Sequence, residues 1–293
     1  MARGGVVRAS ALAAALVVVP FAAHLARAQV PPPEDGEEEP VPSASVSASA
    51  RPHPTAPHII VPFQDGMLEL PGGKFTMGSS DPHAAPNERP PHAVTVQPFR
   101  IDKLEVSVGA YRACVDKHAC ARPQRTSASC TYDLGDPDLP VSCVRWLDAD
   151  TYCRSLGRRL PHETEWEFAG RGTATMRYPW GHATNCAMAA TLYNEITSRS
   201  CSGKTPAKVG THPHGASVFG VLDLTGNVEE WTADFYTESP AEGVSPRAGA
   251  SHVLRGGGWL STPFASRLTV RNWGSSVEAG PNVGFRCAKD IRR

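Results

Sequence analysis

The stretch PVSCVRWLDADTYCRSLGRRLPHETEWEFAGRG, residues 140–172, contains two patterns that are typical of amphipathic helices. In the first, WLDADTYCRSL, apolar residues recur every three or four positions and therefore share one helix face. These residues are Trp146, Ala149, Tyr152, Cys153 and Leu156. Gly157 follows directly and predicts the end of this helix. The second pattern, HETEWEFAGRG, residues 162–172, predicts a shorter helix.

The segments on either side of this stretch combine short strands with turns. MLELPGGKFTMG, residues 67–78, has two apolar runs around a Pro-Gly-Gly turn and predicts a β-hairpin. Ser107 is placed to cap a further helix. Its apolar face would hold Val108, Tyr111, Cys114 and Val115. Beyond residue 172, Gly- and Pro-rich turns separate short apolar runs. Local helices among irregular strands favour the α+β class.

The composition excludes several classes of protein. The 293 residues include 27 Pro and 26 Gly, about 18% of the chain, which favours turns over long helices. The content of hydrophobic residues, 41%, is enough for a sizeable core and excludes wholesale disorder. The 29 basic and 29 acidic residues give a formal net charge of zero, so we expect no nucleic-acid partner.

The first 28 residues have the organisation of a secretory signal peptide. Arg3 and Arg8 accompany an apolar run, and the sequence ARA at residues 26–28 is an A-x-A cleavage site. A membrane anchor is the rival interpretation, but Pro20 interrupts a run that is short for a bilayer span of ~20 residues. No cysteine follows the cleavage site to accept a lipid. We therefore expect a secreted or periplasmic protein with no membrane span after cleavage.

The remaining chain divides into a linker and one domain. Residues 29–58 combine Pro, Ser, Ala and acidic residues with almost no apolar periodicity, which predicts a disordered linker. No comparable linker recurs, so residues 59–293 are expected to form one monomeric domain. All eight cysteines lie in it, and an even count in an exported domain favours disulfides over metal ligands or a catalytic thiol.

Common catalytic signatures are absent from the sequence. There is no GxSxG elbow, no HExxH, no Walker loop and no dinucleotide fingerprint. RGGGWL, residues 255–260, is glycine-rich, but it lacks the glycine spacing of a dinucleotide-binding loop and does not begin a helix. The pattern therefore favours a close-packed turn. These patterns therefore assign no activity.

Several longer blocks occur in a fixed order between residues 67 and 290. They are PGGKFTMGSS, NERPPHAVTV, the stretch at 140–172, YPWG, FGVLDLTGNVEEW, VLRGGGW and NVGFRCAKD. This order resembles the formylglycine-generating enzyme, or sulfatase-modifying factor, family. The resemblance implies a turn-rich, irregular α+β fold related to the C-type lectins and stapled by disulfides.

The positions that carry the family's chemistry differ here. The active members are oxidoreductases that convert a sulfatase cysteine to formylglycine, using copper held by two cysteines after the RGG block. In this sequence the two positions fall on Ser261 and Ser266, and a hydroxyl is a poor ligand for copper(I), which prefers thiolates. By the same resemblance, Gly258 replaces an active-site serine and Glu229 replaces a tryptophan of the oxygen pocket. We therefore expect neither formylglycine generation nor bound copper.

The resemblance also implies a cleft where the active members bind their substrate. In this chain we expect that cleft to belong to a scaffold that binds a peptide, a protein or a glycan. Its candidate lining residues are Trp259, Ser261, Ser266, Arg271, Asn272 and Trp273. The alternative for each is a residue that packs in the core or lies on the surface without a binding role. The alternative is an oxidoreductase, either of the formylglycine-generating type or with rewired chemistry. The family branches that oxidise small thiols with iron carry a His-rich motif that this sequence lacks.

The resemblance also implies a structural calcium site in DLTGNVEEW, residues 223–231. The carboxylates of Asp223 and Glu230 and the carbonyls of Gly226 and Val228 would supply the hard oxygen ligands that calcium takes. The alternative is that the two carboxylates only cap or salt-bridge the turn. The family's second calcium site is not recognisable in residues 182–205.

One disulfide follows from the resemblance and three from nearness in the sequence. In the family, the positions of Cys153 and Cys287 form a bridged pair, which would clamp the end of the domain to a helix. Such a bond would contribute ~3–5 kcal/mol on the chain-entropy model. The pairs suggested by nearness are Cys114–Cys120, Cys130–Cys143 and Cys186–Cys201.

Overall fold

The computed structural model describes residues 66–194, 198–238 and 251–291. The expected signal peptide at 1–28 and the linker at 29–58 lie outside these residues, as does the start of the expected domain. Within the described ranges, no helix is both long enough and apolar enough to cross a membrane.

The described residues form three α-helices and eleven short strands. The helices are α1 (Val108–Asp116), α2 (Trp146–Ser155) and α3 (Glu163–Arg171). The strands before α1 are β1 (Met67–Leu70), β2 (Gly73–Met77), β3 (His92–Val96) and β4 (Phe99–Asp102). The later strands are β5 (Leu192–Asn194), β6 (Arg199–Ser200), β7 (Glu229–Phe235), β8 (His252–Arg255), β9 (Arg271–Gly274), β10 (Val283–Gly284) and β11 (Ala288–Asp290).

All three helices predicted from the sequence are present, and local chemistry explains their ends. The Ser107 hydroxyl accepts a hydrogen bond from the Ala110 amide at 3.2 Å and caps α1. At the start of α3, the Glu165 carboxylate accepts a hydrogen bond from the His162 amide at 2.8 Å. Gly157 follows α2 with φ of 64°, a left-handed conformation that glycine adopts readily.

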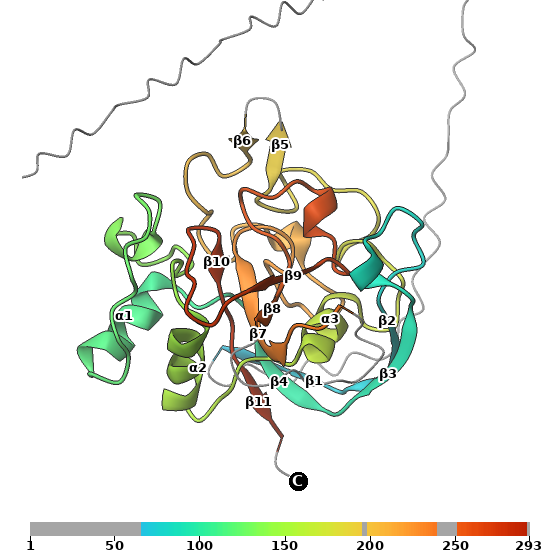
Figure 1. Cartoon of the computed structure of the whole chain (residues 1–293), viewed down its shortest axis with the longest axis horizontal. Helices are drawn as coiled ribbons and strands as arrows, with labels where there is room; N and C mark the ends of the chain where they lie inside the picture. Colours follow the sequence, from blue (N-terminus) through green and yellow to red (C-terminus); the bar gives the residue numbers. More distant parts are fainter. Residues whose placement is uncertain (1–65, 195–197, 239–250, 292–293) are drawn as a thin grey trace, which may run out of the picture. The chain divides into compact units, whose positions relative to one another are not determined.

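Four small sheets organise the strands (Figure 1). The first has the order β1-β4-β11 and is antiparallel, and the second has the order β10-β7-β8-β9, with β10 parallel to β7. The pairs β2-β3 and β5-β6 form two-stranded ribbons. α1 and α2 lie together on one side of the four-stranded sheet, while α3 lies between this sheet and the β2-β3 ribbon. This is the irregular α+β architecture expected from the sequence.

The predicted hairpin at residues 67–78 is wrong. β1 pairs with β4 and β2 pairs with β3, so the two strands belong to different sheets. Gly72 and Gly73, with φ of 65° and 138°, turn the chain from one sheet to the other. A Cβ at Gly72 would lie 2.4 Å from the Val96 carbonyl oxygen, so this crossing also needs a residue without a side chain. The two strands on either side of the turn therefore pair with strands more distant in the sequence and not with each other.

Four disulfides join all eight cysteines of the chain. The pairs are Cys114–Cys120, Cys130–Cys143, Cys153–Cys287 and Cys186–Cys201, the same pairs that the sequence suggests. The Cys153–Cys287 bond spans 134 residues and ties α2 to the segment that leads into β11. The Cys186–Cys201 bond occupies the segment where the second calcium site of the family was not recognisable.

A buried ionic network connects α3 to the four-stranded sheet. Glu163 and Glu167 lie four residues apart and therefore on one face of α3. Arg255 of β8 donates to both carboxylates, and Arg271 of β9 chelates Glu163 at 2.6 and 3.0 Å. Arg171 donates to Glu167 at 2.8 Å. All five side chains are buried, so the packing of α3 depends on paired charges as well as on apolar contacts.

Candidate functional site

The loop that follows β8, residues 257–266, brings the two serines Ser261 and Ser266 together. We call this segment the serine loop. A Cβ placed on Gly257 would lie 2.6 Å from the Ser266 hydroxyl oxygen and 3.1 Å from the Ser261 Cβ. Gly257 has a φ of 60°, so the loop bends sharply at the point that both serines approach. The two positions inferred from the sequence are therefore neighbours in space.

Both serine hydroxyls take part in hydrogen bonds within the loop. The Ser261 Oγ accepts a hydrogen bond from the Gly258 amide at 3.0 Å, and the Ser266 Oγ donates to the Thr262 carbonyl at 3.0 Å. Ser266 is completely buried. Because all eight cysteines are in disulfides, no thiolate is available to serve as a soft metal ligand in place of these hydroxyls.

Next to the serine loop, Glu229 lies at the start of β7 in a small polar cluster. Its amide donates to the Asn282 carbonyl at 2.7 Å, and its Oε1 accepts a hydrogen bond from the Asn272 side chain at 2.5 Å. The Asn282 Oδ1 accepts from the Leu260 amide and would lie 2.1 Å from a Cβ on Gly258. The Asn282 side chain thus fills the space beside Gly258. Sequence reasoning missed Asn282, because only its proximity to Gly258 in the fold indicates a role.

Burial raises the pKa of the Glu229 carboxyl to about 7, and the hydrogen bond from Asn272 lowers it only in part. A carboxyl with a pKa near neutrality can both donate and accept a proton at physiological pH. Glu229 is therefore the group at this site that is best suited to acid–base chemistry.

The raised pKa predicts a pH-dependent stability that the variant Glu229→Gln should remove. The folded pKa of about 7 lies above the ordinary value of 4.5, so the ionised carboxylate destabilises the fold. Stability should therefore fall as the pH rises from 4.5 to 7, and Glu229→Gln should be about 3 kcal/mol more stable than the parent at pH 8. At pH 4 the two proteins should be equal. Urea unfolding at both pH values measures this, with the exposed Glu278→Gln as control.

If Glu229→Gln changed stability equally at pH 4 and pH 8, its effect would be one of packing, and the assignment of the raised pKa would be wrong.

The candidate cleft residues have different environments. Trp259 is buried and its indole donates to the Pro281 carbonyl at 3.2 Å. Asn272 holds Glu229, and Arg271 is buried against Glu163 rather than presented to solvent. Trp273 is 57% exposed and packs beside Tyr236 with a ring separation of 5.9 Å.

Exposed apolar side chains surround the serine loop. Leu260 and Phe264 lie on the loop and are 42% and 49% exposed. Tyr193 is 55% exposed on β5, which reaches the loop through a 2.9 Å hydrogen bond from the Leu192 amide to the Ser261 carbonyl. We call Tyr193, Leu260 and Phe264 the apolar rim. Clustered exposed apolar side chains are typical of binding surfaces.

The second candidate site is the loop DLTGNVEEW, residues 223–231. Asp223, Gly226 and Asn227 all have positive φ, between 59° and 75°, so this loop is sharply curved. The Asp223 Oδ2 accepts from the Gly210 amide at 2.6 Å. Both Glu230 oxygens accept from Arg286 at 2.7 Å, and Oε2 also accepts from the Trp166 indole. Both carboxylates therefore make the structural bonds that the alternative interpretation expects.

A third buried carboxylate, Glu105, joins this loop. It accepts hydrogen bonds from the Asn227 side chain at 2.5 Å and from the Val228 amide at 3.1 Å. Burial and repulsion from Asp223 and Glu230 raise the pKa of Glu105 well above its ordinary value. Sequence reasoning missed this residue, because it lies more than one hundred positions before the loop and only the fold brings it there.

The charge of this cluster fits a bound cation. Three buried carboxylates share one arginine, Arg286, as their nearby counter-charge, and a calcium ion would offset the excess negative charge. Among the described residues, no group of three or more His, Cys, Asp or Glu side chains forms a metal site by itself. An ion here would therefore depend on backbone carbonyls, as the ligand set with Gly226 and Val228 requires.

Comparisons with known proteins agree with these features. The model of the sulfatase-modifying factor enzyme 1-like domain matches residues 60–291. The chain is 31% identical to the inactive C-alpha-formylglycine-generating enzyme 2 of Mus musculus, over 78% of this chain and 86% of the relative. It is 29% identical to the formylglycine-generating enzyme of Streptomyces coelicolor, over 86% of this chain and 95% of that enzyme. The structure of PvdO from Pseudomonas aeruginosa superposes with a TM-score of 0.64 and 27% identity, over 77% of this chain and 94% of PvdO.

The matched segment contains the helices, the sheets, the serine loop and the four disulfides described above. The chain therefore belongs to the family defined by the sulfatase-modifying factor enzyme 1-like domain.

Proposed function

We propose that this protein is an exported, ligand-binding member of the family that does not generate formylglycine. One observation carries the proposal. Ser261 and Ser266 meet at Gly257, where the active enzymes would hold copper, while every cysteine of the chain is committed to a disulfide elsewhere. Family membership leaves activity open, because the relatives include proteins named as active and as inactive enzymes.

The disulfides support the exported location. The chain has four disulfides. Such bonds persist in oxidising compartments and are rare in a reducing cytosol. Together with the signal-peptide pattern at residues 1–28, they favour a secreted or periplasmic monomer.

The ligand in this proposal is a peptide or a glycan, and it docks beside the serine loop. The apolar rim offers exposed aromatic and aliphatic surface, which binding sites for both classes use. Glu229 and Asn272 lie next to this surface and supply polar contacts for orientation.

Peptide and glycan arrays probed with the mature protein test this function. Tyr193→Ala and Phe264→Ala should each weaken binding to the best array ligand about tenfold, since exposed aromatic anchors dominate such interfaces. The matched control is Leu156→Ala, because Leu156 is 47% exposed at the end of α2, away from the serine loop. Absence of any array ligand, or a ligand that binds all three variants equally, would exclude this docking surface.

A second candidate, an oxidoreductase with chemistry that needs no thiolate, is favoured only by Glu229. Its pKa near 7 suits proton transfer at the position where the active enzymes have a tryptophan. Such an enzyme would lose turnover in Glu229→Gln but keep ligand binding, whereas a binding module has no turnover to lose.

We also propose that the loop 223–231 binds one structural calcium ion. Asp223, Glu230 and the carbonyls of Gly226 and Val228 would hold it, and Glu105 would stabilise the loop. Metal analysis of the protein purified in calcium should give about one calcium per chain, and chelation should lower the melting temperature. Asp223→Asn should lose both effects, while the surface variant Asp136→Asn should keep them. A parent protein without calcium would contradict this proposal.

A further inference from the structure

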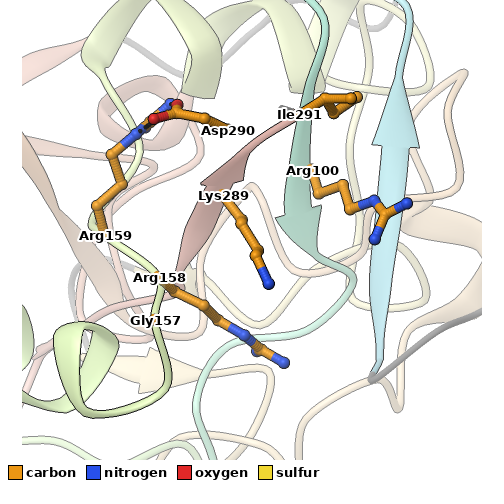
Figure 2. A pocket seen from close by; sticks show the side chains of 7 residues that line it. All are labelled: Arg100, Gly157, Arg158, Arg159, Lys289, Asp290 and Ile291. Atoms are coloured by element: carbon orange, nitrogen blue, oxygen red, sulfur yellow. Dashed lines mark hydrogen bonds and ion pairs between the residues drawn. The ribbon is translucent and has the colours of Figure 1, made fainter. Parts of the chain in front are cut away.

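A pocket of about 670 Å³ opens against the β1-β4-β11 sheet, and it shares no residue with the serine loop or the loop 223–231 (Figure 2). Its charged lining is dominated by cations. Four basic side chains and one acidic side chain line it, and these are Arg100, Arg158, Arg159, Lys289 and Asp290. Arg100 comes from β4, the next two arginines follow α2, and the last two residues belong to β11.

The strand pairing creates this concentration of positive charge. In the register of β4 and β11, Arg100 lies directly opposite Lys289. Like charges in directly opposed positions of a sheet are destabilising unless another group compensates for them. Arg159 is brought alongside by its backbone pairing with Ala288, the residue that precedes Lys289. Glu69, which lies opposite Arg100 on β1, compensates for that arginine, so Lys289 is the cation for which this register provides no opposing carboxylate.

All three arginines pair with carboxylates that do not line the pocket, and Arg159 is held by both oxygens of Glu165 at 2.7 Å. Glu69 pairs with Arg100 at 2.8 Å, and Asp102 pairs with Arg158 at 2.7 Å. Neither carboxylate belongs to the pocket lining. Each one orients its guanidinium from outside the pocket and partly offsets its charge. Arg100 uses its Nε and Nη2 on Glu69, which leaves Nη1 for a ligand.

Lys289 is the least compensated of the four cations. Its ammonium group makes no hydrogen bond or ion pair with any part of the chain that the structure describes. In Figure 2 its side chain extends toward the same end of the pocket as that of Arg158, while Arg159 turns toward Asp290. The Arg159–Asp290 pair removes the single lining carboxylate from competition with an incoming anion.

We propose that this pocket binds the sulfate or phosphate group of a small ligand, with Lys289 and Arg100 as its principal donors. The remaining Nη1 of Arg100 and the Lys289 ammonium group can each donate to an oxygen of a tetrahedral oxyanion. The pocket volume lies in the range of small-molecule sites and exceeds what a single anion fills, so the oxyanion is carried by a larger ligand.

Titration of the mature protein with sodium sulfate, sodium phosphate and p-nitrophenyl sulfate tests the proposal. Melting temperature and calorimetry are read against sodium chloride at equal ionic strength. We expect a saturable response to at least one oxyanion that chloride does not produce, and tighter binding of the ester than of the free anion. The responses to sulfate and to phosphate, compared at equal concentration, identify which oxyanion the pocket prefers.

Matched variants locate the effect. Lys289→Gln and Arg100→Gln should each weaken oxyanion binding at least fivefold, and Lys74→Gln on the exposed part of β2 should leave it unchanged. Lys289→Gln also removes the like-charge pair, so it should fold at least as well as the parent. Phe264→Ala should bind oxyanions normally, which separates this site from the ligand surface at the serine loop. A response equal to that of chloride, or one equally weakened by Lys74→Gln, would overturn the proposal.

Discussion

Replacing Cys153 and Cys287 together by alanine is expected to destabilise the protein by about 5 kcal/mol. This disulfide closes 134 residues, so its loss restores a large chain entropy to the unfolded state. Both sulfurs are completely buried, so the alanines also leave a small cavity beside α2. Urea unfolding followed by circular dichroism measures the change in the free energy of unfolding.

The control for this variant is the pair Cys114 and Cys120, which closes only six residues. The same entropy relation gives about 2 kcal/mol for its double replacement by alanine. The two double variants remove the same number of sulfur atoms from buried positions, so the difference between them isolates loop length. Equal losses of stability would show that loop closure is not the source of the stabilisation.

Glu167→Gln is expected to cost about 3–5 kcal/mol, the cost of breaking a buried ion pair on one side. Glu167 is completely buried and accepts hydrogen bonds from Arg171, from Arg255 and from the Gly78 amide. Glutamine keeps the size of the side chain but removes the charge that compensates the two arginines. Thermal and urea unfolding at neutral pH measure the loss.

Asp150→Asn is the matched control, because Asp150 forms an i,i+4 pair with Arg154 on the surface of α2. The Arg154 side chain is 72% exposed, and surface pairs of this kind contribute about 0.5 kcal/mol or less. If Glu167→Gln cost no more than Asp150→Asn, the buried network could not be a main determinant of how α3 packs on the sheet.

The helices were predictable because their determinants are local. The apolar spacing of α2, the Ser107 cap of α1 and the glycine after α2 all lie within a few residues of the elements they define. The Pro-Gly-Gly turn between β1 and β2 was misread for the opposite reason. Its strands find partners in β3 and β4, and a sequence pattern contains no measure of such non-local pairing.

Only those features of the candidate site that depend on which residue occupies a position could be predicted from the sequence. The resemblance placed Ser261 and Ser266 at the degenerate positions, and the fold brings them together at Gly257. Contacts between distant segments could not be foreseen: Glu105 beside Asn227, Asn282 beside Gly258, and Arg271 held by Glu163. The raised pKa of Glu229 is likewise a product of burial, which depends on the whole fold.

In the proposed function, the fold of the family is kept while formylglycine generation is lost. The disulfides, the α3 network and the curved loop 223–231 maintain the fold independently of the serine loop. Serines in place of a thiolate pair in that loop would therefore remove the copper chemistry without removing the scaffold.

The most direct test is an assay of the purified mature protein with copper and a sulfatase-type Cys-x-Pro-x-Arg peptide. Mass spectrometry reads the conversion of the peptide cysteine to the aldehyde, with an active formylglycine-generating enzyme as the positive control. We predict no aldehyde product and no stoichiometric copper(I) binding, because no thiolate is present to hold the metal. Turnover of the peptide by this protein would contradict the account, since it would show formylglycine generation at a site built from Ser261 and Ser266.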